Sequence, residues 1–334
     1  MRIGVAGVGR IGAFHARTLK GLSQVDSLVL ADAVPGAAEK VAAELGVESA
    51  PSVEALLGAG LDGFVIAAGT PAHAELIRAG VDAGIPTFCE KPAAMNIEET
   101  IDLVRLEQNT EVPVHIGFQR RFDSGYRRVQ QAVASGELGF VHTITSLTFD
   151  SAPPHLDYIP TSGGIFRDCN IHDYDIVRFV TGREVVRVYT VGSNKGDPFF
   201  TEAGDVDSGA SLLTFDDGTT AFVASTRYHA SGHDVRMEVH GSQGALSVGL
   251  DDTLALKSAQ EGVDFPAGPP VMTFMERFQP AYVAELTAFA DVAAGRIPSP
   301  CTVRDGLEAA RIADACQLSK DEGRPVDLSE IATI

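Results

Sequence analysis

Residues 3–12, IGVAGVGRIG, decide the fold of the first half of this chain. The apolar run Ile3–Ala6 predicts a buried strand, and the pattern G-x-G-x-x-G at Gly7, Gly9 and Gly12 opens a helical stretch directly after it. In such a turn the first glycine allows a tight bend, the second lets a pyrophosphate approach the backbone, and the third permits close packing of helix on strand. Free N–H groups at the helix start then receive the negative charge. The stretch therefore predicts a dinucleotide-binding unit.

An acidic residue that ends the second predicted strand completes this pattern. The carboxylate of Asp32 can accept hydrogen bonds from both ribose hydroxyls, and it would repel a 2′-phosphate. The next residues, Ala33–Pro35, offer no Arg or Lys to such a phosphate, so we predict NAD over NADP. The predicted contacts from this part of the chain are Gly7, Gly9, Arg10, Ile11, Gly12 and Asp32. The alternative is a glycine-rich turn in an unrelated α/β domain.

Strands and helices alternate through residues 1–118. The apolar runs that predict strands are Ile3–Ala6, Leu28–Ala31, Gly63–Ala68, Thr87–Cys89 and Val112–Ile116. The helical patterns between them are Ile11–Leu22, Gly36–Leu45, Ala72–Ala83 and Ile97–Glu107. Because the strands are wholly apolar, the alternation predicts an α/β domain whose parallel sheet is covered on both faces.

Residues 119–334 have longer and more closely spaced strand patterns. These patterns lie at His142–Phe149, Val185–Val191, Ala210–Phe215, Thr220–Thr226, Val235–Val239 and Ala245–Val248. The turn sequence Asp216-Asp217-Gly218 predicts a hairpin between two of them. We expect an α/β domain with a large, open, mostly antiparallel sheet. Two more helices are predicted near 280–294 and 303–321, the last packing back toward the first domain. No flexible linker is visible between the halves, so the two domains should share a rigid cleft.

Length, charge and cysteine usage restrict the kind of protein. At 334 residues the chain is long for one core, so two domains are expected. A formal net charge of −19 opposes a nucleic-acid backbone or an anionic membrane surface as partner. No apolar run reaches the roughly 20 residues that span a bilayer. Four scattered cysteines and an N-terminus without a signal-peptide pattern indicate a cytoplasmic enzyme with reduced thiols.

The segment Gly163–Asp175, GGIFRDCNIHDYD, carries acidic and imidazole side chains at helical spacing. Asp168 and His172 stand four residues apart, and Asp175 follows three residues later. If the segment is helical, all three side chains lie on one face about one turn apart. A carboxylate beside an imidazole can fix its tautomer and make it a proton acceptor near neutral pH. The alternative is a capped amphipathic helix with a surface His–Asp pair.

The tripeptide Glu90-Lys91-Pro92 follows a predicted strand at its carboxyl end, where α/β sheets bind ligands. The position between a buried strand and a proline is an improbable one for a lysine whose charge serves only solubility. The functional interpretation of Lys91 is an ammonium group that binds a substrate hydroxyl and favours its alkoxide. The structural interpretation is that Lys91 pairs with Glu90 or caps a helix.

These motifs together resemble the glucose–fructose oxidoreductase, inositol dehydrogenase and rhizopine-catabolism (Gfo/Idh/MocA) family. The resemblance rests on Gly7–Gly12, Glu90–Pro92 and Gly163–His172, and it spans the whole chain in order. The segment Gly117–Asp123, GFQRRFD, looks like the family's crossover into the second domain. The likeness is strongest to the bacterial inositol 2-dehydrogenase branch.

The resemblance implies an N-terminal Rossmann domain followed by an α/β substrate domain, often assembled as a homotetramer through its open sheet. It implies a catalytic site of Lys91, Asp168 and His172, with His172 as the base, and Glu90 beside the cofactor. The other residues implied to contact substrate are Arg120, His155, Asp175 and His233. A surface loop is the alternative for His155. Tyr stands near position 233 in some inositol dehydrogenases, so His233 leaves the exact polyol open.

The turn Thr70-Pro71-Ala72-His73 begins a predicted helix. Thr70 as N-cap with Pro71 in the first helical position is one sufficient explanation of this sequence. Similar enzymes bring this turn beside the nicotinamide ribose, which would make Thr70 and His73 cofactor contacts.

Neither a reactive thiol nor a metal centre is predicted beside Asp168. Cys169 is interpreted as a supporting thiol rather than a nucleophile, because no second histidine stands at a convincing spacing. A metal held by Asp168, His172 and Asp175 is chemically conceivable. The Lys91 ammonium expected in the same cleft would repel a cation, so we predict no metal.

The predicted function is reversible NAD-dependent oxidation of a secondary hydroxyl on a cyclic polyol or sugar, of the myo- or scyllo-inositol type, to the ketone. Two other enzymes on the same scaffold are alternatives: a sugar or glycoside 3-dehydrogenase, and a glycosidase that retains NAD. A non-enzymatic NAD sensor is a further alternative, and the presence of Lys91 argues against it.

Overall fold

The computed structural model describes residues 1–334, and its contacts divide the chain into two compact units. Unit 1 comprises Met1–Gln119, Pro280–Glu308 and Ile334, and unit 2 comprises Arg120–Gln279 and Ala309–Thr333. The first change of unit thus falls between 119 and 120, one residue from the domain boundary drawn on the sequence. Unit 1 also contains Pro280–Glu308, which the sequence prediction placed with the second domain.

Unit 1 is built on a six-stranded parallel sheet, sheet A, with the order β3-β2-β1-β4-β5-β6. Its strands are β1 (Arg2–Ala6), β2 (Ser27–Ala31), β3 (Glu48–Ser49), β4 (Gly63–Ile66), β5 (Thr87–Glu90) and β6 (Val114–Gly117). The sequence predicted all but β3, which is short and exposed and so lacks an apolar run. Because all six strands are parallel, their carboxyl ends lie at one edge of the sheet, where ligands bind in doubly wound folds.

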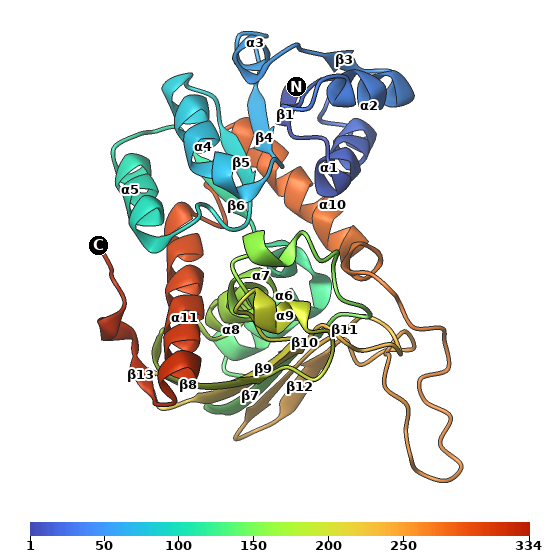
Figure 1. The fold of residues 1–334 in the computed structure, drawn as a ribbon, viewed down its shortest axis with the longest axis vertical. Coiled ribbons are helices and arrows are strands. Elements are labelled where there is room, and N and C mark those ends of the chain that lie inside the picture. The colour runs from blue at the N-terminus through green and yellow to red at the C-terminus, as the bar shows by residue number, and fades with distance from the viewer. The chain divides into compact units, whose positions relative to one another are not determined.

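Helices cover both faces of sheet A, as predicted from its apolar strands. They are α1 (Arg10–Gly21), α2 (Ala37–Leu45), α3 (Val53–Leu57), α4 (His73–Asp82) and α5 (Ile97–Gln108). Figure 1 shows α1 and α2 on one side of the sheet and α4 and α5 on the other. The core between sheet and helices includes Val5, Leu30 and Phe88, and α10 (Phe274–Ala293) adds Leu286 and Phe289 to it.

Unit 2 contains a seven-stranded sheet, sheet B, with the order β12-β11-β7-β10-β9-β8-β13. Its strands are β7 (Val141–Phe149), β8 (Val185–Ser193), β9 (Ser208–Phe215), β10 (Thr220–Thr226), β11 (Asp234–Gly241), β12 (Ala245–Val248) and β13 (Val326–Asp327). All neighbours are antiparallel except β7 and β10, which are parallel. The predicted hairpin is confirmed, because Gly218 at φ +89° closes the turn between β9 and β10.

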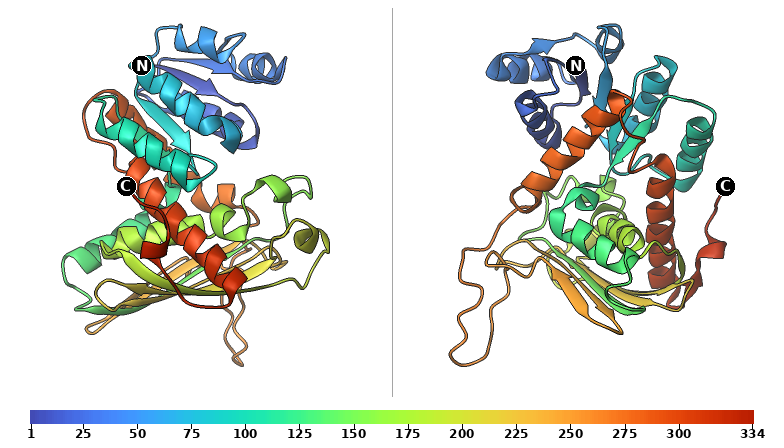
Figure 2. Two further views of the ribbon diagram at one scale, coloured as in Figure 1. Left: turned by 60° about the vertical axis from the view of Figure 1, so that its left-hand side comes forward. Right: turned by 180° about the vertical axis from the view of Figure 1, so that it is seen from behind.

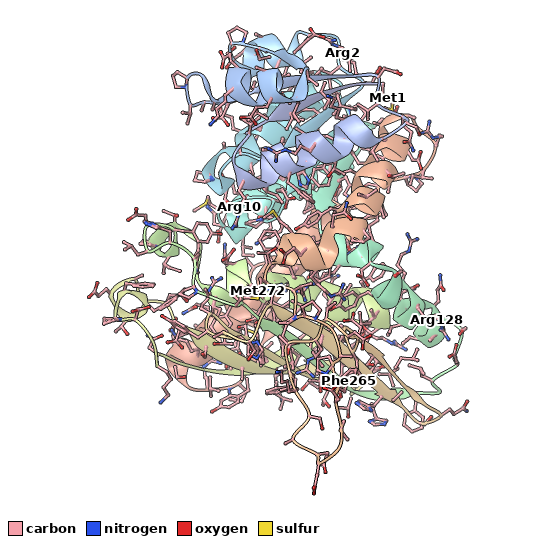
Figure 3. All side chains as sticks on the ribbon, turned by 90° about the vertical axis from the view of Figure 1, so that its right-hand side faces the viewer. Met1, Arg2, Arg10, Arg128, Phe265 and Met272 are labelled. Atoms are coloured by element: carbon pink, nitrogen blue, oxygen red, sulfur yellow. The ribbon has the colours of Figure 1, made fainter.

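The helices of unit 2 leave one face of sheet B open. They are α6 (Ser124–Ala134), α7 (Ile165–Asp168), α8 (Ile171–Thr181), α9 (Phe199–Glu202) and most of α11 (Val303–Glu322). Figure 2 shows α6 and α8 on one face and no helix on the other. A long loop that contains Phe265 follows β12 and extends away from the sheet (Figure 3). No helix of the chain has the length and apolar character that crossing a bilayer requires.

Candidate active site

The glycine turn between β1 and α1 has the geometry that its sequence predicts. Gly7 has φ +89°, and an added Cβ would lie 2.5 Å from the Ala68 nitrogen, so only glycine fits there. An added Cβ at Gly12 would lie 2.0 Å from the Gly7 carbonyl oxygen, which explains the close packing of helix on turn. A Cβ at Gly9 would meet no protein atom within 4 Å. The protein itself therefore does not require glycine at this position, whereas a closely approaching ligand would.

The start of α1 and the end of β2 fit a dinucleotide. Gly9 is the N-cap of α1 and provides no side-chain cap, so the first N–H groups of the helix face a ligand position. Arg10, the first residue of α1, is exposed at this end (Figure 3). The Asp32 carboxylate accepts hydrogen bonds from the backbone N–H groups of Val8 at 2.7 Å and Val34 at 2.8 Å. Each oxygen has a further lone pair for a ribose hydroxyl.

Lys91 directly follows β5 at the same edge of sheet A and is half-buried. Glu90, at the end of that strand, lies 2.5 Å from Nε2 of the buried His15 on α1. The His73 ring contacts the carbonyl oxygen of Pro92 at 2.7 Å and that of Ala68 at 3.0 Å. One histidine therefore contacts the Glu90 side chain on one side of Lys91, and another contacts the Pro92 backbone on the other side.

The interpretation of Thr70 as an N-cap is wrong. Gly69, not Thr70, is the N-cap, and Thr70–Ala72 form a 3₁₀ turn before α4. His73 is only 1 % exposed, and both ring nitrogens contact carbonyl oxygens of unit 1. The buried ring thus connects Ala68 and Pro92, and Thr70 is partly exposed, while the cofactor contacts of both residues stay predictions.

In unit 2, Asp168 and His172 belong to two short helices rather than to one. Gly163 and Gly164, at φ +82° and +86°, turn the chain sharply into α7, as their sequence predicted. Helix α7 ends at Asp168 and α8 begins at Ile171. The two intervening residues keep right-handed helical backbone angles, so the spacing of about one turn survives the interruption. His172 stands half-buried in the first turn of α8.

The carboxylate of Asp168 is held from two sides. The Tyr158 hydroxyl donates to Oδ1 at 2.8 Å, and Nη2 of Arg227 donates to Oδ2 at 2.8 Å. Partial desolvation raises the pKa of the Tyr158 phenol, and the neighbouring carboxylate of Asp168 raises it further, so this phenol stays a hydrogen-bond donor. The arrangement favours an ionised, oriented carboxylate one turn before His172.

A second carboxylate shares the same arginine. Asp150, just after β7, accepts from Nη1 of Arg227 at 3.1 Å, and its other oxygen lies 3.4 Å from Nδ1 of His233. Burial by itself raises the pKa of Asp150. The hydrogen bond with His233 and the charge of Arg227 outweigh it and hold that pKa below its usual value. His233 is 5 % exposed, and its ring contacts Asp150 and the ring of Phe274.

Arg120 and Asp175, both expected to contact substrate, are buried in separate ion pairs. Arg120 donates to Asp173 at 2.8 Å and to the Thr148 hydroxyl at 2.8 Å. Asp175 is 0 % exposed and accepts from Nε and Nη2 of Arg121 at 2.6 to 3.2 Å. These contacts hold the 3₁₀ turn Gln119–Phe122, which precedes α6, to helix α8. His155, in contrast, is an exposed loop histidine 3.3 Å from Asp157.

Sequence reasoning missed Arg227, Tyr158 and Asp150. No local motif marks these three residues. For Asp150 and Arg227, the information that the sequence did not provide is the relative direction of strands β7 and β10. Because β7 and β10 are parallel, with Phe149 opposite Thr226, the next residues of both strands, Asp150 and Arg227, leave the sheet at the same edge. A wholly antiparallel sheet would have separated them. No group of three His, Cys, Asp or Glu side chains in the chain is arranged to hold a metal ion.

Comparison with known proteins supports the same interpretation of both units. Residues 1–118 match the family description "Oxidoreductase family, NAD-binding Rossmann fold", and residues 126–247 match "GFO/IDH/MocA C-terminal domain". Myo-inositol dehydrogenase Hyg17 of Streptomyces leeuwenhoekii is 37 % identical over 326 residues, covering 97 % of this chain and 98 % of that protein.

Two solved structures share the fold over nearly their whole length. A myo-inositol dehydrogenase from Corynebacterium glutamicum has a TM-score of 0.90 at 33 % identity, with 98 % of each chain covered. Scyllo-inositol dehydrogenase from Lactobacillus casei, with bound NAD(H) and scyllo-inositol, has a TM-score of 0.88 at 28 % identity, covering 98 % of this chain and 99 % of that chain. The chain therefore belongs to the Gfo/Idh/MocA family of NAD-dependent oxidoreductases.

Proposed function

We propose that this enzyme oxidises a secondary hydroxyl of a cyclic polyol of the inositol type to the ketone. Two of the proteins named above are myo-inositol dehydrogenases, and the third is a scyllo-inositol dehydrogenase. The observation that carries the proposal is the fixed carboxylate of Asp168 one turn before the half-buried His172. Such a pair suits removal of a proton from a hydroxyl group, which is half of an alcohol oxidation.

The proposed roles follow from the chemistry of each side chain. His172 accepts the hydroxyl proton, and Asp168 fixes its tautomer and stabilises the imidazolium that forms. Lys91 stabilises the developing alkoxide. When bound at the glycine turn and Asp32, NAD supplies the electrophilic carbon that accepts the hydride. Arg120, Asp175 and His233 are then supports of this site, in keeping with their buried contacts.

A steady-state assay of NADH absorbance tests this function. Wild-type enzyme is assayed with myo-inositol, scyllo-inositol, aldoses and simple glycosides, each with NAD and with NADP. We expect turnover of an inositol with NAD, and kcat lowered roughly 10²-fold or more in Lys91→Ala and in His172→Ala. The exposed Lys257→Ala and His142→Ala serve as matched controls and should keep wild-type kcat.

The outcomes separate the alternatives. Turnover of glycosides but of no inositol would favour a glycoside 3-dehydrogenase, and glycoside cleavage without net NADH would favour a glycosidase. Unchanged kcat in either site variant would contradict the assigned roles. A wild type that prefers NADP would contradict the role of Asp32.

We also propose that the enzyme assembles with copies of itself, as a homotetramer, through the open face of sheet B. Three large apolar side chains are register neighbours there: Leu212 lies opposite Phe222 on one side and Tyr189 on the other. All three are more than a third exposed, and Val191 extends the patch. A patch of this kind on an uncovered sheet suits an identical patch on a second copy. Light scattering should give four times the chain mass, and a monomer would contradict the proposal.

We further propose a cytoplasmic location. All four cysteines, Cys89, Cys169, Cys301 and Cys316, are buried and free rather than paired in disulfides. Cell fractionation measures the location directly, and recovery from an extracellular fraction would contradict it.

A further inference from the structure

Arg227 connects two carboxylates of unit 2 that lie far apart in the sequence. It follows β10, is 2 % exposed, and donates from Nη2 to Asp168 and from Nη1 to Asp150, at 2.8 and 3.1 Å. The same Nη1 lies 2.8 Å from the sulfur of Cys169. One guanidinium therefore fixes the end of α7 to the edge of sheet B at the parallel pair β7 and β10.

The charge of this arginine is retained in spite of its burial. Burial by itself lowers the pKa of Arg227, but Cys169, Asp168 and Asp150 raise it above its ordinary value. A buried carboxylate is costly unless a charged partner and hydrogen bonds compensate for the lost water. Arg227 supplies both to Asp168 and to Asp150.

The other partners of the two carboxylates are weaker anchors. Tyr158, which donates to Asp168, stands on the segment before α7 and is 44 % exposed. The distance from His233 to Asp150, 3.4 Å, is longer than either hydrogen bond from Arg227. The planar guanidinium, buried and bonded to both carboxylates, restricts the orientation of Asp168 more than the partly exposed Tyr158 does.

We propose that Arg227 is a positioning residue for the reaction: it holds Asp168 ionised and oriented so that Asp168 can orient His172. This inference rests on the proposed function, in which His172 is the base. Arg227 itself does not touch the substrate in this proposal. Its second bond, to Asp150, ties that orientation to the end of β7, where Asp150 also contacts His233.

A purely structural ion pair is the alternative, and kinetics distinguish the two. In Arg227→Met we expect kcat lowered about 10²-fold, because a small misplacement of a catalytic group has an effect of that size. Arg227→Lys keeps the charge without the fork geometry and should recover part of the loss, to within roughly tenfold of wild type. KM for NAD should change less than kcat in both variants. The solvent deuterium isotope effect on kcat should rise, because proton transfer to His172 becomes slower.

Arg167→Met is the matched control. Arg167 precedes Asp168 on α7 and forms a two-pronged pair with Asp314, at 2.5 to 2.6 Å, that involves no proposed site residue. Its loss should lower the melting temperature but leave kcat within about twofold of wild type. If Arg227→Met keeps wild-type kcat, or if Arg167→Met reproduces its kinetic loss and isotope effect, the positioning role is overturned.

A substrate-free measurement separates this inference from the proposed function. Melting temperatures of wild type, Arg227→Met, Asp168→Asn and the double variant form a cycle. We expect the double variant to lose less than the sum of the two single losses, and additive losses would overturn the inference. Should Arg227→Met not fold, Arg227→Lys takes its place in the cycle. A wild type that oxidises no polyol contradicts the proposed function, whatever the cycle gives.

Discussion

The two units of this enzyme build their functional edges in opposite ways. The edge of sheet A that fits NAD consists of backbone N–H groups, glycines and one carboxylate, most of them within a few residues of the first β-turn-α unit. The group around Asp168, where α7 meets the edge of sheet B, consists of charged and polar side chains from four separate segments: Asp150, Tyr158, Asp168 and Arg227. An anion such as pyrophosphate is bound well by backbone groups, whereas proton transfer needs titratable side chains in a fixed orientation. The chemistry that each edge performs explains the difference.

Because unit 2 depends on buried charged side chains, we expect that removal of a buried charge lowers its stability more than removal of an exposed charge does. Arg121→Met leaves the fully buried Asp175 without its two-pronged partner, and we expect the free energy of unfolding to fall by about 3–5 kcal/mol. The control Arg128→Met breaks the half-exposed pair with Glu137 and should cost less than about 1 kcal/mol. Urea denaturation followed by circular dichroism measures both. Equal losses in the two variants would contradict the structural importance of the buried pair.

Two alanine substitutions in the glycine turn of unit 1 test whether its backbone binds NAD. Gly12→Ala forces a Cβ to within 2.0 Å of the Gly7 carbonyl oxygen, so it should lower both the melting temperature and the affinity for NAD. Gly9→Ala meets no protein atom, so the melting temperature without ligand should stay near wild type. We expect its NAD dissociation constant to rise about tenfold, equivalent to about 1.4 kcal/mol. Calorimetric titration gives the affinity. Wild-type affinity in Gly9→Ala would show that the pyrophosphate does not approach this residue.

The sequence predicted the strands of both sheets with small errors at their ends. Wholly apolar runs and alternating patterns report burial on two faces or on one, and they report it locally. The two-residue strands β3 and β13 were missed, because pairing with a neighbour rather than an apolar run defines them. The break between α7 and α8 was missed as well. Neither Cys169 nor Asn170 is a helix-breaking residue such as Gly or Pro, and both have near-helical backbone angles.

The partners of the predicted site residues were less accessible to sequence reasoning. Asp175 and Arg120 were interpreted as substrate contacts, and the structure pairs them with Arg121 and Asp173. In the segment Gln119–Asp123 two adjacent arginines face two different acids of α8, and the sequence does not say which pairs with which. Tertiary packing decides this, since the cost of burying a charge is offset only by the partner that the fold places beside it.

The sequence by itself determined the nucleotide half of this protein. The glycine spacing, the strand before it and Asp32 after it are local, and local backbone geometry is what binds a pyrophosphate. Only the tertiary structure decided the surroundings of Asp168. Arg227 lies 59 residues from Asp168 along the chain, and a single parallel strand pair in a mostly antiparallel sheet places it beside Asp150, at the edge that α7 meets. Strand direction depends on the whole sheet, so no local pattern could have revealed that contact.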